Sequence, residues 1–293
     1  MASNTADSRK TVLITGCSQD SIGEQLAREF HRRGFHVIAT ARSLSRLTRL
    51  TSLGIDTREL DLLSTESIHA FSLGVTKLDI LINNAGDKHL MPFADTAPKD
   101  FRYMFEINVF PHFEITQLLL PHLIHSKGII VNHTSQSAHG FKSPASAYAS
   151  AKAALATLTD CMRLELEPFG VRVVELVTGM AQGNMTKFET TYTLPRGSIY
   201  EPIREPLETN MKAEAARPMV MDGERYARRV VSDLLDGWFG TPKWIWRGAF
   251  ATTMYWVLVA NTLWKGCTDG LFRAALGFGG LKRNLNEAKQ HSS

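Results

Sequence analysis

Apolar and polar positions follow two different periods along the first two thirds of the chain. Short runs rich in Val, Ile and Leu predict strands, and the segments between them repeat apolar residues every three or four positions, as helices do. The predicted strands are Thr11–Ile14, His36–Thr40, Ile55–Leu60, Leu78–Ile82, Gly128–Asn132 and Val171–Val177. Because strands that are apolar on both faces are buried in parallel sheets, this pattern predicts an α/β fold, a doubly wound parallel sheet between two layers of helices.

Helical spacing covers further segments, and the region after the sixth strand breaks the pattern. The predicted helices are Ile22–Arg33, Leu44–Leu53, Phe101–His125, Ala147–Glu167, Glu224–Leu235 and Ala249–Trp264, with a last strand at Lys243–Arg247. Between residues 179 and 221 four prolines interrupt any long regular element. A segment of that length in a compact domain is usually functional, so 179–221 is interpreted as a substrate loop or lid, with an idle surface excursion as the alternative.

No linker or repeat divides the chain, so we expect one α/β domain over residues 9–247, including the loop, and a hydrophobic C-terminal extension over 248–293. The extension contains an uncharged stretch of 17 residues, 248–264, which is just too short to span a membrane. Its aromatic side chains predict peripheral contact with a membrane, or packing onto the core or a partner subunit.

Composition excludes several classes of protein. Hydrophobic residues make up 44% and charged residues 21% of the 293 residues, as in globular proteins and unlike disordered or fibrous ones. The net charge is 33 − 29 = +4, and the basic residues are scattered, so no nucleic-acid partner is predicted. The three cysteines form no C-x-x-C pair, which argues against a disulfide framework or a metal site, and the N-terminus lacks an apolar signal sequence. These features predict a cytoplasmic protein.

The turn Thr15–Gly23 lies between the first strand and the first helix, where backbone N–H groups and the helix N-terminus favour a phosphate. This position predicts a dinucleotide site, with an ordinary strand-to-helix turn as the alternative. The candidate cofactor-binding residues of the turn are Gly16, Ser18, Asp20, Ser21, Ile22 and Gly23.

Tyr148 and Lys152 stand four positions apart at the start of a predicted helix, so both side chains lie on one face. An ammonium group in that place lowers the pKa of the phenol and lets the tyrosine act as a general acid or base. Ser135 follows a predicted strand, and Asn108 precedes it in the chain. Together with the Asn-Asn-Ala-Gly segment at residues 83–86, these positions fall near the carboxyl ends of strands, where open α/β sheets bind ligands.

The order of Thr-Gly turn, Asn-Asn-Ala-Gly, Asn, Ser and Tyr-x-x-x-Lys over residues 11–179 closely resembles the classical short-chain dehydrogenase/reductase family, which has a Rossmann fold. The resemblance implies that Tyr148 protonates the substrate oxygen while a nicotinamide cofactor reduces the substrate. It implies that Ser135 hydrogen-bonds the carbonyl, that Lys152 holds the nicotinamide ribose, and that Asn108 anchors a water in a proton relay.

The resemblance also assigns further contacts with the cofactor. It implies that Asp61 and Leu62 contact the adenine and that Asn84, Ala85 and Gly86 line the cofactor channel. It places Thr178, Gly179 and Met180 beside the nicotinamide. Family members commonly pair helices between subunits, so a homodimer or homotetramer is expected.

Cofactor choice depends on the end of the second strand, where NAD-preferring relatives carry an acid. Here Ala41 occupies that position and Arg42 follows it. A guanidinium group suits a 2′-phosphate, so we predict NADPH as the cofactor and reduction as the direction. The alternative is that Arg42 is a solvated arginine ahead of a helix and does not bind the cofactor.

Two departures from the family pattern leave a rival function open. Asp20 stands where the family has glycine, and the run after Gly179 lacks the family's threonine. Both favour an enzyme that isomerises, dehydrates or cyclises its substrate by acid/base chemistry with nicotinamide use weakened or lost. A hydrolase is disfavoured, because no G-x-S-x-G segment is present.

Further motifs resemble the fungal-type 1-acyl-dihydroxyacetone-phosphate reductases. They are Thr-Gly-Cys-Ser at residues 15–18, Val-Ile-Ala-Thr-Ala-Arg at 37–42 and Trp-Ile-Trp-Arg-Gly-Ala at 244–249. This resemblance implies reduction of a ketone on a hydrophobic substrate, lipid-like or polyketide-like, in lipid or secondary metabolism. It also implies attachment to the endoplasmic reticulum or to lipid droplets as an alternative to a free cytoplasmic protein.

Overall fold

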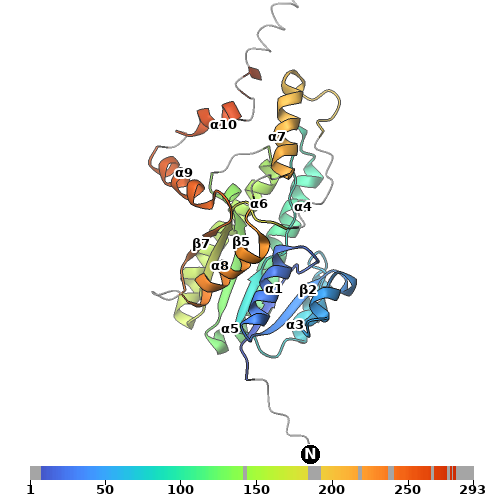
Figure 1. The fold of residues 1–293 in the computed structure, drawn as a ribbon, viewed down its shortest axis with the longest axis vertical. Coiled ribbons are helices and arrows are strands. Elements are labelled where there is room, and N and C mark those ends of the chain that lie inside the picture. The colour runs from blue at the N-terminus through green and yellow to red at the C-terminus, as the bar shows by residue number, and fades with distance from the viewer. Residues whose placement is uncertain are drawn as a thin grey trace, which may run out of the picture.

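The structure is a computed structural model that describes residues 8–140, 144–183, 193–216, 220–236, 241–264, 267–275, 278, 280 and 281. Seven parallel strands form one sheet in the order β3-β2-β1-β4-β5-β6-β7. The strands are β1 Thr11–Ile14, β2 His36–Ala41, β3 Asp56–Glu59, β4 Ile80–Asn83, β5 Ile129–Ser135, β6 Arg172–Thr178 and β7 Trp244–Arg247. The predicted doubly wound parallel sheet, a Rossmann fold, is confirmed (Figure 1).

Helices cover both faces of this sheet. The α-helices are α1 Ile22–Arg32, α2 Thr48–Thr51, α3 Thr65–Leu73, α4 Pro98–Asn108, α5 Phe110–Ser126, α6 Ser146–Leu166, α7 Arg204–Ala216, α8 Gly223–Leu235, α9 Ala251–Leu263 and α10 Asp269–Ala275. The short 3-10 turns are η1 Leu44–Arg46, η2 Phe93–Asp95, η3 Gln136–Ala138, η4 Glu167–Phe169 and η6 Glu201–Ile203.

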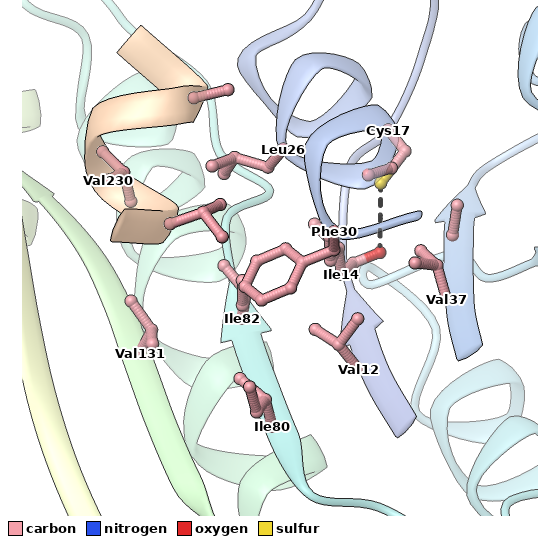
Figure 2. Packing of buried hydrophobic residues seen from close by; sticks show 14 of the residues in the cluster. Val12, Ile14, Cys17, Leu26, Phe30, Val37, Ile80, Ile82, Val131 and Val230 are labelled. Carbon is pink, nitrogen blue, oxygen red and sulfur yellow. Dashed lines mark hydrogen bonds between the residues drawn. The ribbon is translucent and has the colours of Figure 1, made fainter. Parts of the chain in front are cut away.

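The core forms two layers because successive side chains of a strand point to opposite faces. Val12 and Ile14 pack with Leu26 and Phe30 of α1 and with Val230 of α8, as Figure 2 shows. On the opposite face, residues of β1, β4 and β5 pack against α3, α4, α5 and α6. This arrangement places the sheet in the centre and brings the carboxyl ends of its strands to one edge.

One predicted helix, Phe101–His125, is two helices in the structure. The chain leaves helical geometry at Val109, whose φ is −127° and ψ −65°, so α4 ends at Asn108 and α5 starts at Phe110. Pro111 lies in the first turn of α5, where its missing N–H would have no helical acceptor. The prediction of one continuous helix was therefore wrong, and the break sets Asn108 at a helix end.

The segment 179–221 contains a regular element that the proline pattern did not predict. Helix α7 extends over 13 residues, and Pro206 lies in its first turn, where proline is tolerated. Leu194, Ile203 and Leu207 form a small cluster with Met211, separate from the two layers of the main core. In Figure 1, α7 projects beyond the sheet and its covering helices.

The C-terminal helices also lie outside the main body of the fold (Figure 1). In α9 only Ala251 is buried, whereas Trp256 and Leu263 are 63% and 66% exposed. Among the described residues, no helix has the length and apolar character needed to cross a membrane.

Candidate active site

A cleft opens at the carboxyl ends of the strands, across the point where β1 lies between β2 and β4. This is the crossover point at which open α/β sheets bind their ligands. The cleft brings together most of the residues that the sequence predicts: Gly16, Ser18, Ser21, Ile22, Arg42, Leu62, Asn84, Ala85, Gly86, Ser135, Tyr148, Lys152, Thr178 and Gly179.

The turn after β1 is locked against the segment after β4. Gly16 has φ +73°, and a Cβ atom there would lie 2.8 Å from the Ala85 Cα, so a side chain at this position has no room. The Asn84 amide NH₂ group donates to the carbonyl oxygens of Thr15 at 2.7 Å and Gly16 at 3.1 Å. The Thr15 hydroxyl accepts the backbone N–H groups of Asn84 and Ala85, each at 3.0 Å. These contacts fix one wall of the cleft.

Asp20 lies in the turn but does not line the cleft. Its φ is +63°, in the left-handed region. Glycine, which the family has here, adopts this backbone conformation without steric strain, and aspartate adopts it more readily than most other residues. Its carboxylate contacts the Arg49 guanidinium at 2.9 Å, and its backbone N–H donates to the buried Glu24 carboxylate. The Asp20 carboxylate is therefore paired with a cation, which reduces the repulsion that its charge would exert on a bound pyrophosphate.

Tyr148, Lys152 and Ser135 meet at one end of the cleft. All three are buried, and the Lys152 Nζ lies 6.0 Å from the centroid of the Tyr148 ring. The ammonium group donates to the His133 backbone carbonyl at 2.9 Å. Burial lowers the pKa of Lys152 to about 7, because the surrounding protein disfavours the charged form. The Ser135 hydroxyl accepts the Ser137 N–H, which leaves its own hydrogen available to a ligand.

Four other predicted site residues do not line the cleft: Asn108, Gly23, Asp61 and Met180. The Asn108 amide donates to the carbonyl oxygens of Asp87 and Met104 and accepts the Asp87 N–H. Its side chain thus supports the segment after β4. Asp61 accepts the Leu63 N–H, and Met180 exchanges backbone hydrogen bonds with Ala249. Gly23 packs against the turn, since a Cβ atom there would lie 2.4 Å from the Gly16 carbonyl oxygen.

Several residues that line the cleft were not predicted as site residues: Arg46, Asp87, Tyr103, Ile107 and His133. Arg46 stands four positions after Arg42, and both residues line the cleft. A basic pair at that spacing was a signal that the sequence carried. Asp87 accepts a hydrogen bond from the Tyr103 hydroxyl, and burial together with Asp87 raises the pKa of Tyr103.

Cys17 also lies in the turn, but its thiol faces the core. It is fully buried and donates to the Ile14 carbonyl oxygen, as Figure 2 shows. Burial raises the pKa of this thiol to about 12, so it stays protonated and unreactive at neutral pH. Cys17 therefore contributes packing to the turn and no nucleophile.

A family model described as short chain dehydrogenase matches residues 10–192. The chain belongs to the short-chain dehydrogenase family. It is 43% identical to a short-chain dehydrogenase/reductase of Pestalotiopsis microspora over 83% of this chain and 86% of that protein. It is 36% identical to the NADPH-dependent 1-acyldihydroxyacetone phosphate reductase of Schizosaccharomyces pombe over 68% of this chain and 70% of that protein.

Solved short-chain dehydrogenases share the architecture. One from Streptomyces avermitilis has a TM-score of 0.76 at 26% identity and covers 90% of this chain and 99% of its own. A metagenomic short-chain oxidoreductase in complex with NADP has a TM-score of 0.54 at 26% identity, and a Brucella ovis oxidoreductase with a partially ordered NAD has 0.53 at 29%. Each of these two covers 58% of this chain and 82% of its own.

The cleft residues fit a nicotinamide dinucleotide. The N-terminus of α1 lies at the cleft, because its capping residue Ser21 and its first residue Ile22 line it, and a helix N-terminus suits a pyrophosphate. Leu60 and Leu62 form an apolar wall beside Arg42 and Arg46, which suits an adenosine with an anionic substituent. Tyr148 and Lys152 stand at the opposite end.

Proposed function

We propose that this short-chain dehydrogenase/reductase uses NADPH to reduce a ketone on a hydrophobic substrate to an alcohol, with Tyr148 as the general acid. One observation carries the proposal: Tyr148, Ser135 and Lys152 line the same cleft as Arg42 and Arg46, which follow β2 on the other side of β1 and β4. The NADPH-dependent relative in Schizosaccharomyces pombe supports the cofactor and the class of substrate.

The chain's own groups supply the proton and the orientation for this reaction. When bound, the nicotinamide would supply a hydride, a hydrogen with its two electrons, to the carbonyl carbon. Tyr148 donates its hydroxyl proton to the carbonyl oxygen, and Ser135 donates a hydrogen bond to the same oxygen and so fixes its direction. Lys152, held by the His133 carbonyl, places positive charge near the Tyr148 ring whenever it is protonated.

Preference for NADPH over NADH follows from charge at the adenosine end. Arg42 and Arg46 line this end, where a guanidinium group can bind a 2′-phosphate by two parallel hydrogen bonds. Arg46 is also held close to the turn, because its carbonyl oxygen accepts the Gln19 N–H. Because solved relatives bind either NADP or NAD, we assign the preference of this chain for NADPH to Arg42 and Arg46.

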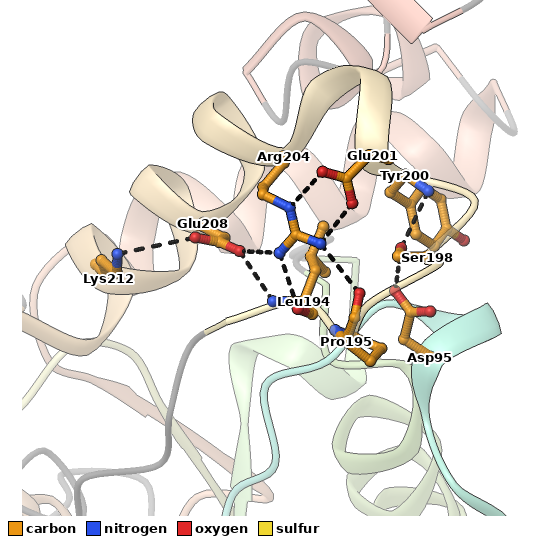
Figure 3. A network of polar contacts seen from close by, with 9 residues as sticks. All are labelled: Asp95, Leu194, Pro195, Ser198, Tyr200, Glu201, Arg204, Glu208 and Lys212. Atoms are coloured by element: carbon orange, nitrogen blue, oxygen red, sulfur yellow. Dashed lines mark hydrogen bonds and ion pairs between the residues drawn. The ribbon is translucent and has the colours of Figure 1, made fainter.

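An apolar cluster joins the α7 region to the segment that follows the cleft. Leu194, Leu207 and Met211 pack with Met91, which lies in the segment that follows the cleft residues Ala85–Asp87. The Ser198 hydroxyl donates to the Asp95 carboxylate at 2.6 Å and ties the α7 region to the same segment (Figure 3). The α7 region is therefore attached to the segment that leaves the active-site cleft, in the position that a substrate loop requires.

The non-reductive rival loses part of its support. It rested on Asp20 and on the absent threonine after Gly179. Because the Asp20 carboxylate contacts Arg49 and does not line the cleft, reduction is the function that we propose. The test is NADPH absorbance in the presence of 1-palmitoyl-dihydroxyacetone phosphate, 2-dodecanone and a long-chain β-keto ester. Consumption of NADPH with formation of an alcohol supports the proposal, and product formed without consumption of NADPH overturns it.

Two assembly properties accompany the proposed function. A homo-oligomer through α4, α5 and α6 is supported by the exposed apolar side chains of Phe101, Phe110 and Phe113 on α4 and α5. Peripheral membrane contact, at the endoplasmic reticulum or at lipid droplets, is supported by exposed Trp256 and Trp264 around the uncharged α9. Light scattering and co-sedimentation with phosphatidylcholine vesicles test these two proposals.

A further inference from the structure

A chain of polar side chains crosses the protein interior at the carboxyl ends of β4, β5 and β6. His133 lies in the middle of it, with its Nδ1 2.8 Å from the Asn84 amide oxygen and its Nε2 2.5 Å from the Thr178 hydroxyl. Thr178 lies 2.5 Å from the Tyr226 hydroxyl of α8. His133, Thr178 and Tyr226 are buried. The first two line the cleft, so the chain connects the cleft to a helix behind it.

Hydrogen-bond chemistry fixes the donor at each link. The Asn84 NH₂ group donates to two backbone carbonyl oxygens of the turn, so the oxygen of the same amide faces His133 and can only accept. The His133 Nδ1 must therefore carry the hydrogen, and the Nε2 of the neutral ring accepts the hydrogen of Thr178. The oxygen of Thr178 then accepts the hydrogen of Tyr226. In this single arrangement the hydroxyls of Thr178 and Tyr226 and both ring nitrogens of His133 have a hydrogen-bond partner.

The arrangement requires a neutral imidazole, and its surroundings keep it neutral. Burial first, and the positive charge of Lys152 second, lower the pKa of His133 to about 3. The donor pattern therefore persists over the pH range in which such enzymes work.

The same residue contacts the catalytic end of the cleft through its backbone. The His133 carbonyl oxygen accepts the hydrogen bond of the Lys152 ammonium at 2.9 Å. The ring of His133 thus holds Asn84, which holds the turn at Thr15 and Gly16, while its carbonyl holds Lys152. One residue joins the turn that suits a pyrophosphate to the ammonium that stands beside Tyr148.

We infer that His133 is a positioning residue, which fixes the spacing between the cofactor-binding turn and Lys152 through the ordered chain Tyr226–Thr178–His133–Asn84. The inference rests on the proposed function for its kinetic consequences. The hydrogen-bond arrangement itself is a property of the free protein and is tested without cofactor or substrate.

The first test is NMR of the free protein labelled with ¹⁵N-histidine, with His133→Gln used to assign the signal. The inference predicts a neutral ring with hydrogen on Nδ1 and a bare Nε2 from pH 5 to pH 8. A ring that carries its hydrogen on Nε2, or that becomes charged within this range, overturns the arrangement.

The second test compares His133→Phe with His133→Gln. Phenylalanine fills the space of the ring without donor or acceptor, whereas glutamine keeps one of each. Because two buried partners lose a hydrogen bond, His133→Phe is expected to weaken NADPH binding roughly tenfold in a fluorescence titration and to lower kcat at saturating NADPH. His133→Gln is expected to restore both quantities to within about threefold of the native values.

Each outcome decides the inference. Native NADPH affinity and kcat in His133→Phe, or equal losses in His133→Gln and His133→Phe, overturn it. If His133→Phe does not fold, Thr178→Val removes both links of the Thr178 hydroxyl, to the His133 Nε2 and to the Tyr226 hydroxyl, and unchanged NADPH affinity and kcat in that variant overturn the inference instead. Failure of the native protein to bind NADPH contradicts the proposed function, while the NMR result still decides the arrangement of hydrogen bonds.

Discussion

The strand-end cleft and the region after residue 193 are stabilised in different ways. Around the cleft, hydrogen bonds join residues far apart in the chain, such as Asn84 with Thr15 and Thr178 with Tyr226. In the α7 region most polar contacts are local: Arg204 contacts Glu201 and Glu208 of the same segment and the carbonyl oxygens of Leu194 and Pro195 (Figure 3).

We propose that this difference separates the chemistry, which belongs to the cleft, from the choice of substrate, which belongs to the α7 region. Long-range contacts between buried groups hold the cleft at one geometry, and the family match at residues 10–192 covers the strands that provide them. The α7 region is held to the preceding part of the fold through an apolar cluster and the Ser198–Asp95 contact, so its sequence can change without disturbing the cleft. We therefore expect substitutions in the cleft to affect the chemical step and the cofactor, and substitutions around α7 to affect the substrate.

The largest effect is expected at the proposed general acid. Tyr148→Phe removes the proton donor and keeps the ring, so kcat for ketone reduction should fall roughly 10²- to 10⁴-fold. NADPH binding, measured by fluorescence titration, should change little. Tyr103→Phe, which removes a hydroxyl from the cleft wall, is the control. Equal activity in Tyr148→Phe and the native protein would contradict the assignment.

The buried ammonium is expected to affect stability in a pH-dependent way. The pKa of Lys152 is about 7 in the folded protein and 10.5 ordinarily, so between these values the unfolded chain binds a proton that the folded chain does not. The unfolding free energy of the free enzyme therefore rises with pH across this window, by up to roughly 1.4 kcal/mol per unit from this group.

Lys152→Met lacks this contribution, so the difference between native and variant unfolding free energies should rise with pH from 7 to 10.5. Urea unfolding at several pH values measures it. Lys99→Met, at an exposed position of α4, is the control. A flat difference for Lys152→Met would mean that the ammonium is not desolvated.

The adenosine end of the cleft should show a smaller effect, confined to one cofactor. Arg42→Ala removes a guanidinium group from the expected 2′-phosphate site, so the Kd for NADPH should rise about tenfold and the Kd for NADH by less than about twofold. Arg28→Ala, an exposed arginine of α1 outside the cleft, controls for net charge. Native binding of both cofactors by Arg42→Ala would remove the basis for NADPH preference.

In the α7 region the expected effect is smaller and concerns the substrate. Arg204→Met breaks contacts with Glu201 and Glu208, and ion pairs that stay partly exposed contribute little, so KM for the ketone should rise at most about fivefold. The Kd for NADPH should stay unchanged. Arg228→Met, which breaks a similar pair with Glu224 on α8, is the matched control. A loss of NADPH affinity in Arg204→Met would break the separation between the two regions.

The smallest effect on stability is expected at the C-terminal helix. Trp256 is 63% exposed, so Trp256→Ser should change the unfolding free energy by no more than roughly 0.5 kcal/mol. If α9 contacts membranes, the same variant should bind phosphatidylcholine vesicles more weakly in co-sedimentation. Leu73→Ser, at an 88% exposed position of α3, should leave vesicle binding unchanged. Equal vesicle binding by all three proteins would argue against membrane contact.

The sequence predicted the sheet because its strands are buried on both faces. Short runs of Val, Ile and Leu between helical segments are typical of such strands. The motifs predicted where the sheet would place Tyr148, Lys152 and Ser135, since strand ends and helical spacing fix these positions. The break at Val109 and the helix α7 were missed. Pro111 and Pro206 lie in the first turns of helices, and a proline alone does not tell whether a helix starts there or is interrupted.

Side-chain direction in the site depended on contacts that no spacing reveals. Asp20 was expected to face a phosphate, and only the fold brings Arg49 near enough to turn it away. His133 was one of ten histidines, and its place between Asn84 and Thr178 requires three strand ends to meet. Arg46 is different, because its spacing from Arg42 was visible in the sequence.

The central claim is that this cleft uses NADPH to reduce a ketone. The most direct measurement supplies the protein with NADPH deuterated at nicotinamide C4, in the position it transfers, and with 1-palmitoyl-dihydroxyacetone phosphate, 2-dodecanone or a long-chain β-keto ester, and analyses the product by mass spectrometry. The account predicts an alcohol that carries one deuterium on the former carbonyl carbon, formed in equal amount to the NADPH consumed and lost in Tyr148→Phe. A product that forms without deuterium and without consumption of NADPH would contradict it.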